Sequence, residues 1–254
     1  MQILLTIAYD GTNYAGWQRQ ENAIAVQQKI EEALSAILNR SVTVQGASRT
    51  DAGVHAIGQR AAFTAPGLLV PLDKLPQVVN GLLPPDISVT AAEIVPNEFN
   101  PRFDAECKTY TYQIYNAAYP NPLFARYSAF VPQRLNIAAM QKAAVQFIGR
   151  HDFAAFCATG SSAKTTVREI YECNVKKQKS GTITLTITGN AFLYNMVRII
   201  AGTILYVGLG KIPTIEIGEI IALKDRKCAG KTMPPQGLTL QNIVYNMDKP
   251  PGVR

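Results

Sequence analysis

The stretch QGASRTDAGVHA, residues 45–56, lies between two predicted strands, 42–46 and 58–64. Small residues surround its two charged residues, Arg49 and Asp51, so a backbone or a substrate can approach them closely. We predict a loop at a sheet edge, where functional groups are often displayed. A solvated ion pair on an ordinary surface turn gives the same pattern, and the spacing alone favours neither interpretation.

The elements around this stretch predict an α+β fold. Residues 1–100 follow the order strand, helix, strand, strand, helix, strand, which is that of a ferredoxin-like split βαβ unit. Residues 101–254 give a similar but less regular series. We therefore expect two such halves with mixed, mainly antiparallel sheets, meeting around a central basic cleft.

The predicted boundaries follow from apolar periodicity and turn residues. Asn136 and Thr214 are expected to cap the third and the last helix. Strands are predicted at 2–9, 42–46, 58–64, 87–95, 108–115, 169–177, 182–188 and 238–245, and helices at 26–39, 72–83, 137–147, 191–207 and 215–223.

The composition indicates a globular protein with an excess of basic residues. Of the 254 residues, 47% are hydrophobic, which is enough for a core. The 25 Lys and Arg residues outnumber the 18 Asp and Glu residues, giving a net charge of +7. Such an excess suits a polyanionic partner, although many soluble proteins share it.

Several chemistries find no support in the sequence. Four cysteines without a CxxC pair and only two histidines predict no metal site. No phosphate-binding or dinucleotide-binding glycine motif occurs, so no cofactor is predicted, and no serine-hydrolase or zinc-protease motif is present. The unpaired cysteines and the absence of a signal peptide predict a cytoplasmic protein. The longest apolar run, 199–210, is too short to span a membrane.

Carboxylate chemistry is what remains. Asp51 is the leading candidate, with Arg49 either as its charge partner or as a group that grips phosphate. Arg198 lies in a predicted apolar helix, where a guanidinium needs a negative partner unless it reaches the surface. Tyr110 and Tyr112 share one face of a predicted strand, where they either stack on bases or belong to the core.

Together, these residues belong to an ordered set of motifs that resembles the tRNA pseudouridine synthase A family across nearly the whole chain. One departure is Ser48, where the family pattern has glycine. The matching residues are Tyr9-Asp10-Gly11, Gly16-Trp17-Gln18-Arg19-Gln20, Arg49-Thr50-Asp51-Ala52-Gly53-Val54-His55, Lys108-Thr109-Tyr110-Thr111-Tyr112, Asn190-Ala191-Phe192, Met196-Val197-Arg198, Lys224-Asp225-Arg226 and Gly237-Leu238.

The resemblance implies an isomerase that converts uridine to pseudouridine at positions 38, 39 and 40 of the anticodon stem-loop of tRNA. It implies a homodimer that needs neither a metal nor an organic cofactor. By the same resemblance, Asp51 is the catalytic aspartate, Tyr110 an active-site tyrosine and Arg198 a second active-site cation. The residues expected to bind the RNA are Arg49, Tyr110, Trp17, Gln18, Arg19 and His55.

The chemistry of this reaction requires residues of these types. The N1–C1′ bond is cleaved, the uracil turns, and C5 is joined to C1′, after the base has left the stack at a cost of a few kcal/mol. Asp51 would attack C1′ or C6, or assist glycal formation by taking a sugar proton, and the sequence does not choose among these routes. Tyr110 would stack on the flipped uracil and help remove the C5 proton, and Arg198 would keep Asp51 ionised.

Two other functions account for part of the pattern. A non-catalytic, basic tRNA-binding protein would also need the positive charge and the aromatic residues, but it would not need Asp51 beside Arg49. A carboxylate-based hydrolase such as a glycosidase would need a second acid near the first, and no such partner of Asp51 is evident in the sequence.

Overall fold

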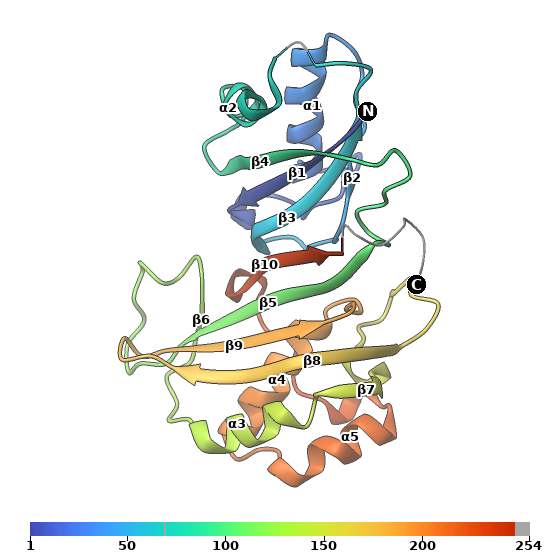
Figure 1. The fold of residues 1–254 in the computed structure, drawn as a ribbon. Helices are drawn as coiled ribbons and strands as arrows, with labels where there is room; N and C mark the ends of the chain where they lie inside the picture. The colour runs from blue at the N-terminus through green and yellow to red at the C-terminus, as the bar shows by residue number, and fades with distance from the viewer. Residues whose placement is uncertain (69, 247–254) are drawn as a thin grey trace. The chain divides into compact units, whose positions relative to one another are not determined.

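A computed structural model describes residues 1–68 and 70–246 of the chain. Its contacts divide the chain into two compact units, each with its own strands and helices (Figure 1). The first unit contains Met1–Glu106 and the residues from Leu240, and the second unit contains Cys107–Thr239. This arrangement of mixed strands and helices confirms the predicted α+β class.

The first unit has the strand order of a ferredoxin-like split βαβ unit. β1 (Gln2–Tyr9) lies between β4 (Ile87–Val95) and β3 (His55–Thr64) and is antiparallel to both. Along its other edge, β3 is joined by β2 (Gln45–Gly46) and β10 (Leu238–Tyr245). The loop that carries Asp51 therefore connects β2 to its antiparallel neighbour β3.

Two helices cover one face of these strands, α1 (Val26–Leu38) and α2 (Leu75–Asn80) (Figure 1). α1 ends as predicted, because Asn39 adopts a left-handed conformation and its N–H bonds to the carbonyl of Ser35. A single apolar stripe of α1 is buried, as its periodicity predicts: Val26, Ile30, Ala33 and Leu34.

The last strand, β10, lies mostly in the first unit, which contains it from Leu240 onward. The Tyr245 hydroxyl donates to the carbonyl of Pro101 at 2.7 Å, its ring meets Phe99 edge to face at 5.0 Å, and the Arg60 guanidinium lies over it. The predicted halves, 1–100 and 101–254, assigned this strand to the second half. The structure places it in the first unit because its side chains pack there, and the functional roles of the two halves stay predictions.

The second unit repeats the split βαβ order with β5, β9 and β8. β9 (Thr182–Gly189) lies between β5 (Ala105–Tyr115) and β8 (Val167–Lys177) and is antiparallel to both. β7 (Gly149–Asp152) extends the sheet beyond β8, and β6 (Ala129–Phe130) runs parallel to the end of β5.

Three helices accompany these strands: α3 (Ile137–Val145), α4 (Met196–Gly208) and α5 (Ile217–Leu223) (Figure 1). Asn136 caps α3 as predicted, because its side chain accepts from the N–H of Ala139. α4 is buried on nearly all sides, as expected of a helix that is apolar around its whole circumference.

The segment 42–46 is the clearest difference from the predicted strands, because only Gln45 and Gly46 form β2. Side chains of α1 accept hydrogen bonds from the backbone of residues 42–44, just before β2. The Ser35 hydroxyl accepts from the N–H of Val42, and the Glu31 carboxylate accepts from the N–H of Val44. These residues satisfy their hydrogen bonds without a neighbouring strand.

Three predicted helix starts are also wrong. The helix predicted from 191 begins at Met196, because Asn195 just before it has a left-handed backbone. Thr214 is no cap: residues 214–216 form a 3-10 turn that α5 continues. Similarly, the helix predicted at 72–83 is a 3-10 turn at 72–74 followed by α2, with proline in its first turn.

Candidate active site

Asp51 is the first residue of a four-residue β-turn, Asp51 to Val54. The N–H of Val54 bonds to the Asp51 carbonyl at 3.1 Å, and Gly53 supplies the positive φ, 77°, that a type II turn needs at its third position. The Asp51 side chain is half-buried. The predicted loop is therefore a defined turn with the carboxylate at its first residue.

The loop that follows β1 locks this turn in place. The N–H of Trp17 donates to the carbonyl of Thr50 at 3.0 Å, and the N–H of Gly53 donates to the carbonyl of Tyr14 at 3.3 Å. The hydroxyls of Tyr9 and Thr50 are 2.8 Å apart and share a hydrogen bond. Asp51 is thus fixed by bonds on both sides of it in the sequence.

Gly16 makes this close approach possible. Its φ is +94°, and a Cβ added to it would lie 2.5 Å from the carbonyl oxygen of Thr50 and 3.1 Å from the carbonyl carbon of Asp51. Gly11 contacts the same loop, because a Cβ there would lie 2.0 Å from the carbonyl oxygen of Val54. Both glycines of the family motifs therefore allow two backbones to touch.

Ser48, the departure from the family pattern, is accommodated without strain. Among the described residues, only Asn39, Asn195 and Lys224 combine a side chain with a positive φ, so Ser48 keeps an ordinary backbone. The buried side chain of Gln59 holds it, donating to the Ser48 carbonyl at 2.7 Å and accepting from its N–H at 3.3 Å. Serine therefore replaces glycine here at no conformational cost.

Trp17 and His55 are buried, with 2% and 4% of their surfaces exposed. The indole lies against Gly46, where an added Cβ would be 2.1 Å from Nε1. His55 Nδ1 accepts from the N–H of Gly11 at 3.0 Å, so we assign the ring proton to Nε2. Asp10 Oδ1 also lies 3.1 Å from Nδ1. Nδ1 cannot both accept from Gly11 and donate to Asp10, so we assign the tautomer from the hydrogen bond of Gly11. Both side chains join the segments that hold Asp51.

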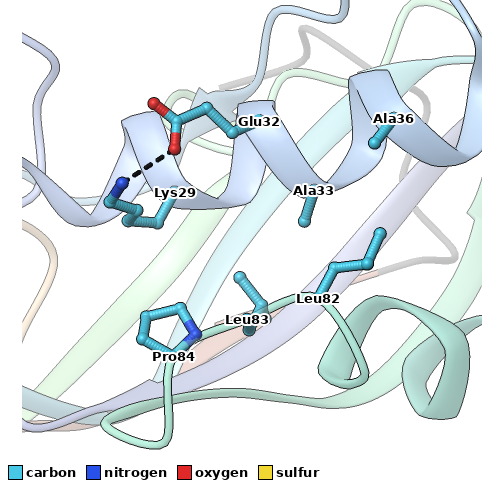
Figure 2. A pocket seen from close by; sticks show the side chains of 7 residues that line it. All are labelled: Lys29, Glu32, Ala33, Ala36, Leu82, Leu83 and Pro84. Carbon is cyan, nitrogen blue, oxygen red and sulfur yellow. Dashed lines mark hydrogen bonds and ion pairs between the residues drawn. The ribbon is translucent and has the colours of Figure 1, made fainter.

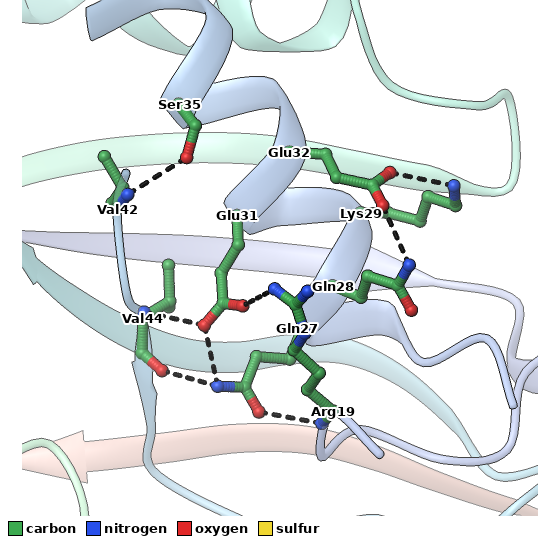
Figure 3. A network of polar contacts seen from close by, with 9 residues as sticks. All are labelled: Arg19, Gln27, Gln28, Lys29, Glu31, Glu32, Ser35, Val42 and Val44. Carbon is green, nitrogen blue, oxygen red and sulfur yellow. Dashed lines mark hydrogen bonds and ion pairs between the residues drawn. The ribbon is translucent and has the colours of Figure 1, made fainter. Parts of the chain in front are cut away.

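A buried carboxylate, Glu31, organises the neighbouring loop (Figure 3). It accepts from Arg19 at 3.0 Å, from the Gln27 amide at 2.9 Å and from the N–H of Val44 at 3.0 Å. The Arg19 side chain is 58% exposed and pairs with this carboxylate, while Gln18 is exposed. The network connects α1, the loop after β1 and the approach to β2.

Arg49 is exposed, and within residues 1–68 and 70–246 no ion pair joins it to Asp51. Of the two roles that the sequence left open, charge partner of Asp51 or phosphate ligand, the structure therefore does not show the first. The guanidinium points to no fixed acid in the described chain.

Tyr110 and Arg198 belong to the second unit. Tyr110 is on β5 with 6% of its surface exposed, and its ring meets Phe192 edge to face at 5.2 Å. This contact connects two of the motifs, because Phe192 belongs to the Asn190-Ala191-Phe192 stretch.

Tyr112, the other tyrosine of this strand, is fully buried, and its hydroxyl donates to the carbonyl of Pro234 at 2.8 Å. Burial raises the pKa of this phenol, and the nearby Arg198 guanidinium opposes the shift. Gly237 leaves room for the ring, because a Cβ there would lie 2.6 Å from it. Tyr112 is therefore a core residue that packs near Arg198 and holds the segment of Pro234.

Arg198 lies in the first turn of α4, not in its middle as predicted. Its Nε donates to the carbonyl of Met233 at 2.7 Å, and its Nη1 donates to Asn195 Oδ1 at 2.6 Å. Two neutral acceptors within the second unit thus contribute to holding the guanidinium.

Three residues that hold the site were not predicted: Gln59, Asn195 and Glu31. Gln59 is a polar residue at a buried position of a strand, and Glu31 is an acid on the apolar face of α1. Both violate the pattern of their elements, which is the signal that would have identified them. Asn195 interrupts an apolar run in the same way.

A hollow of the first unit lies between α1 and residues 82–84, and no predicted site residue lines it (Figure 2). Alanine and leucine side chains form its walls, and the ion pair between Lys29 and Glu32 lies at one side. The Glu32 carboxylate there is exposed and paired with Lys29, and no RNA-binding motif residue lies beside it, so the Asp51 turn remains the candidate site.

In the described part of the chain, no group of three or more histidine, cysteine or acidic side chains is arranged to hold a metal ion. None of the helices described between residues 1 and 246 is both long and apolar enough to cross a membrane.

Comparisons with known proteins agree with the motifs. A family model described as tRNA pseudouridine synthase matches residues 5–104 and 143–246. The chain is 51% identical to the tRNA pseudouridine synthase A of Ruminiclostridium cellulolyticum and 47% identical to those of Caldicellulosiruptor bescii and Geotalea uraniireducens. Each alignment covers 96% of this chain and 99% of the relative. A solved structure described as a Cbf5-Nop10-Gar1 complex gives a TM-score of 0.38 at 12% identity over 94% of this chain and 48% of that one, which is too weak a likeness to support an argument.

Proposed function

This chain belongs to the tRNA pseudouridine synthase family, and we propose that it isomerises uridine to pseudouridine at positions 38, 39 and 40 of the anticodon stem-loop of tRNA. The observation that carries this proposal is the immobilised turn of Asp51. A carboxylate that attacks a sugar or a base, or removes a proton, must be held in one place, and bonds from Trp17 and to Tyr14 do this.

In the proposed reaction, the target uridine leaves the stack and Asp51 acts on it. The carboxylate attacks C1′ or C6, or takes a sugar proton to form a glycal, and each route uses the ionised form. Tyr110 stacks on the uracil and helps to remove the C5 proton. Arg198 is the cation that keeps Asp51 ionised and aimed. The motif matches support these three roles. So do the bonds that hold the Asp51 turn, the ring contact of Tyr110 and the bonds of Arg198, each within its own unit.

The residues around Asp51 take two kinds of role in this proposal. The exposed side chains of Arg49, Gln18 and Arg19 contact the RNA backbone. Trp17 and His55, which the resemblance also made RNA ligands, act mainly by holding the segment, since the indole packs on Gly46 and His55 Nδ1 accepts from the N–H of Gly11.

The test is to map pseudouridine in a tRNA transcript with uridine at positions 38, 39 and 40 after incubation with the purified chain. Asp51→Asn keeps the shape of the side chain but not its charge, so we expect turnover to fall more than about 100-fold while tRNA binding persists. Asp73→Asn, at an exposed position, serves as the matched control and should be fully active. Tight binding without any product would favour a non-catalytic tRNA-binding protein.

We also propose that the chain acts as a homodimer in the cytoplasm. The family resemblance supports the dimer, and the four free cysteines suit a reducing compartment. Sedimentation of the purified chain at micromolar concentration should give twice the mass of one chain; a single-chain mass under conditions of full activity would contradict the dimer.

A further inference from the structure

We propose that Asn195 is a positioning residue, which holds the Arg198 guanidinium in the orientation that the isomerisation uses. The inference rests on the proposed role of Arg198.

Asn195 has an unusual backbone and an unusual side-chain partner. Its φ of 60° and ψ of 7° place it in the left-handed region, which asparagine tolerates better than most residues. It occupies the N-cap position of α4, where asparagine normally accepts from a backbone N–H of the first turn. It makes no such bond, and its Oδ1 accepts from Arg198 Nη1 at 2.6 Å instead.

A cation in the first turn of a helix needs such support. The unpaired N–H groups there carry partial positive charge, which disfavours an arginine. A free arginine side chain also samples many rotamers. The bonds to Asn195 Oδ1 and to the Met233 carbonyl fix two of the three guanidinium nitrogens. Because both acceptors are neutral, they orient the guanidinium without cancelling its charge.

The second anchor is a backbone carbonyl that is itself held in place, so Asn195 is the acceptor that a side-chain substitution can remove. The N–H of Met233 donates back to the carbonyl of Arg198 at 3.2 Å. Three residues upstream, the N–H of Gly230 donates to the buried Thr203 hydroxyl at 2.8 Å, and Arg226 donates to the Gly230 carbonyl at 2.9 Å. Gly202 lets the segment touch α4, since a Cβ there would lie 1.8 Å from the carbonyl oxygen of Lys231.

The matched test replaces Asn195 with glycine, which keeps the left-handed backbone but removes the acceptor. We expect kcat for pseudouridine formation to fall about ten- to 100-fold, as for the loss of a hydrogen bond to a charged group, while KM for tRNA stays within about twofold. Asn195→Asp restores an acceptor and should be faster than Asn195→Gly. The control is Asn39→Gly, which changes the same residue type in the same conformation at the end of α1 and should leave kcat unchanged.

A double-mutant cycle separates positioning from a general structural effect. If Asn195 acts through Arg198, adding Asn195→Gly to Arg198→Lys lowers kcat by less than about twofold, because lysine has already lost the bond. Full kcat in Asn195→Gly, or an equal loss in both backgrounds, would overturn the inference while the function stands. A wild-type chain that makes no pseudouridine would overturn the proposed function instead.

Discussion

The absence of a side chain at Gly16 allows the backbone of Asp51 to take its position in this protein. Gly16 has a φ of +94° and touches the backbone on both sides of the Thr50–Asp51 peptide bond. An L-residue is strained at this φ, and its Cβ would push the turn away. We therefore expect Gly16→Ala to lower the free energy of unfolding by about 2 kcal/mol or more, and to lower kcat, as measured by urea denaturation and pseudouridine formation.

Gly210→Ala is the matched control for this substitution. Gly210 also has a positive φ, +70°, but an added Cβ would meet nothing within 4 Å. It should cost about 1 kcal/mol from the backbone alone and leave kcat unchanged. Equal effects of the two substitutions on kcat would show that contact with the Asp51 turn does not matter.

At the level of elements, the sequence predicts what depends on periodicity and misses what depends on side chains of other elements. The ranges of α1 and β4 follow from local patterns, and both are confirmed. Residues 42–44 look like a strand but are bonded by Ser35 and Glu31 of α1, which no local pattern reveals.

The same limit applies to the candidate site. Asp51 and Arg49 are identifiable because charged residues among small ones are unusual, and Tyr110 and Arg198 gain their assignments from the motifs. The Met233 carbonyl that holds Arg198 is a backbone group, so no residue type marks it. Asn195 is visible as a polar interruption, but its left-handed conformation depends on the packing around it.

For the whole molecule, the net charge of +7 makes a prediction about salt. If tRNA is held through its phosphates, each contact releases bound cations, and affinity falls as salt rises. We expect the dissociation constant for tRNA to increase at least about tenfold between 50 and 200 mM salt. Filter binding across this range measures it, and a flat profile would contradict RNA as the main partner.

Matched variants assign part of this salt dependence to the Asp51 loop. Arg49→Ala should reduce the slope of log K against log salt by about one, as for the loss of one phosphate contact. Lys29→Ala is the control, because the Lys29 ammonium is paired with Glu32 at 2.8 Å, and it should leave the slope unchanged.

A single-turnover pseudouridine map is the sharpest test of whether Asp51 is the carboxylate of a tRNA uridine isomerase. Wild type and Asp51→Asn are each mixed in excess with a transcript carrying uridine at positions 38, 39 and 40. We expect pseudouridine at these positions with wild type and none above background with Asp51→Asn. Equal modification by both proteins would contradict it.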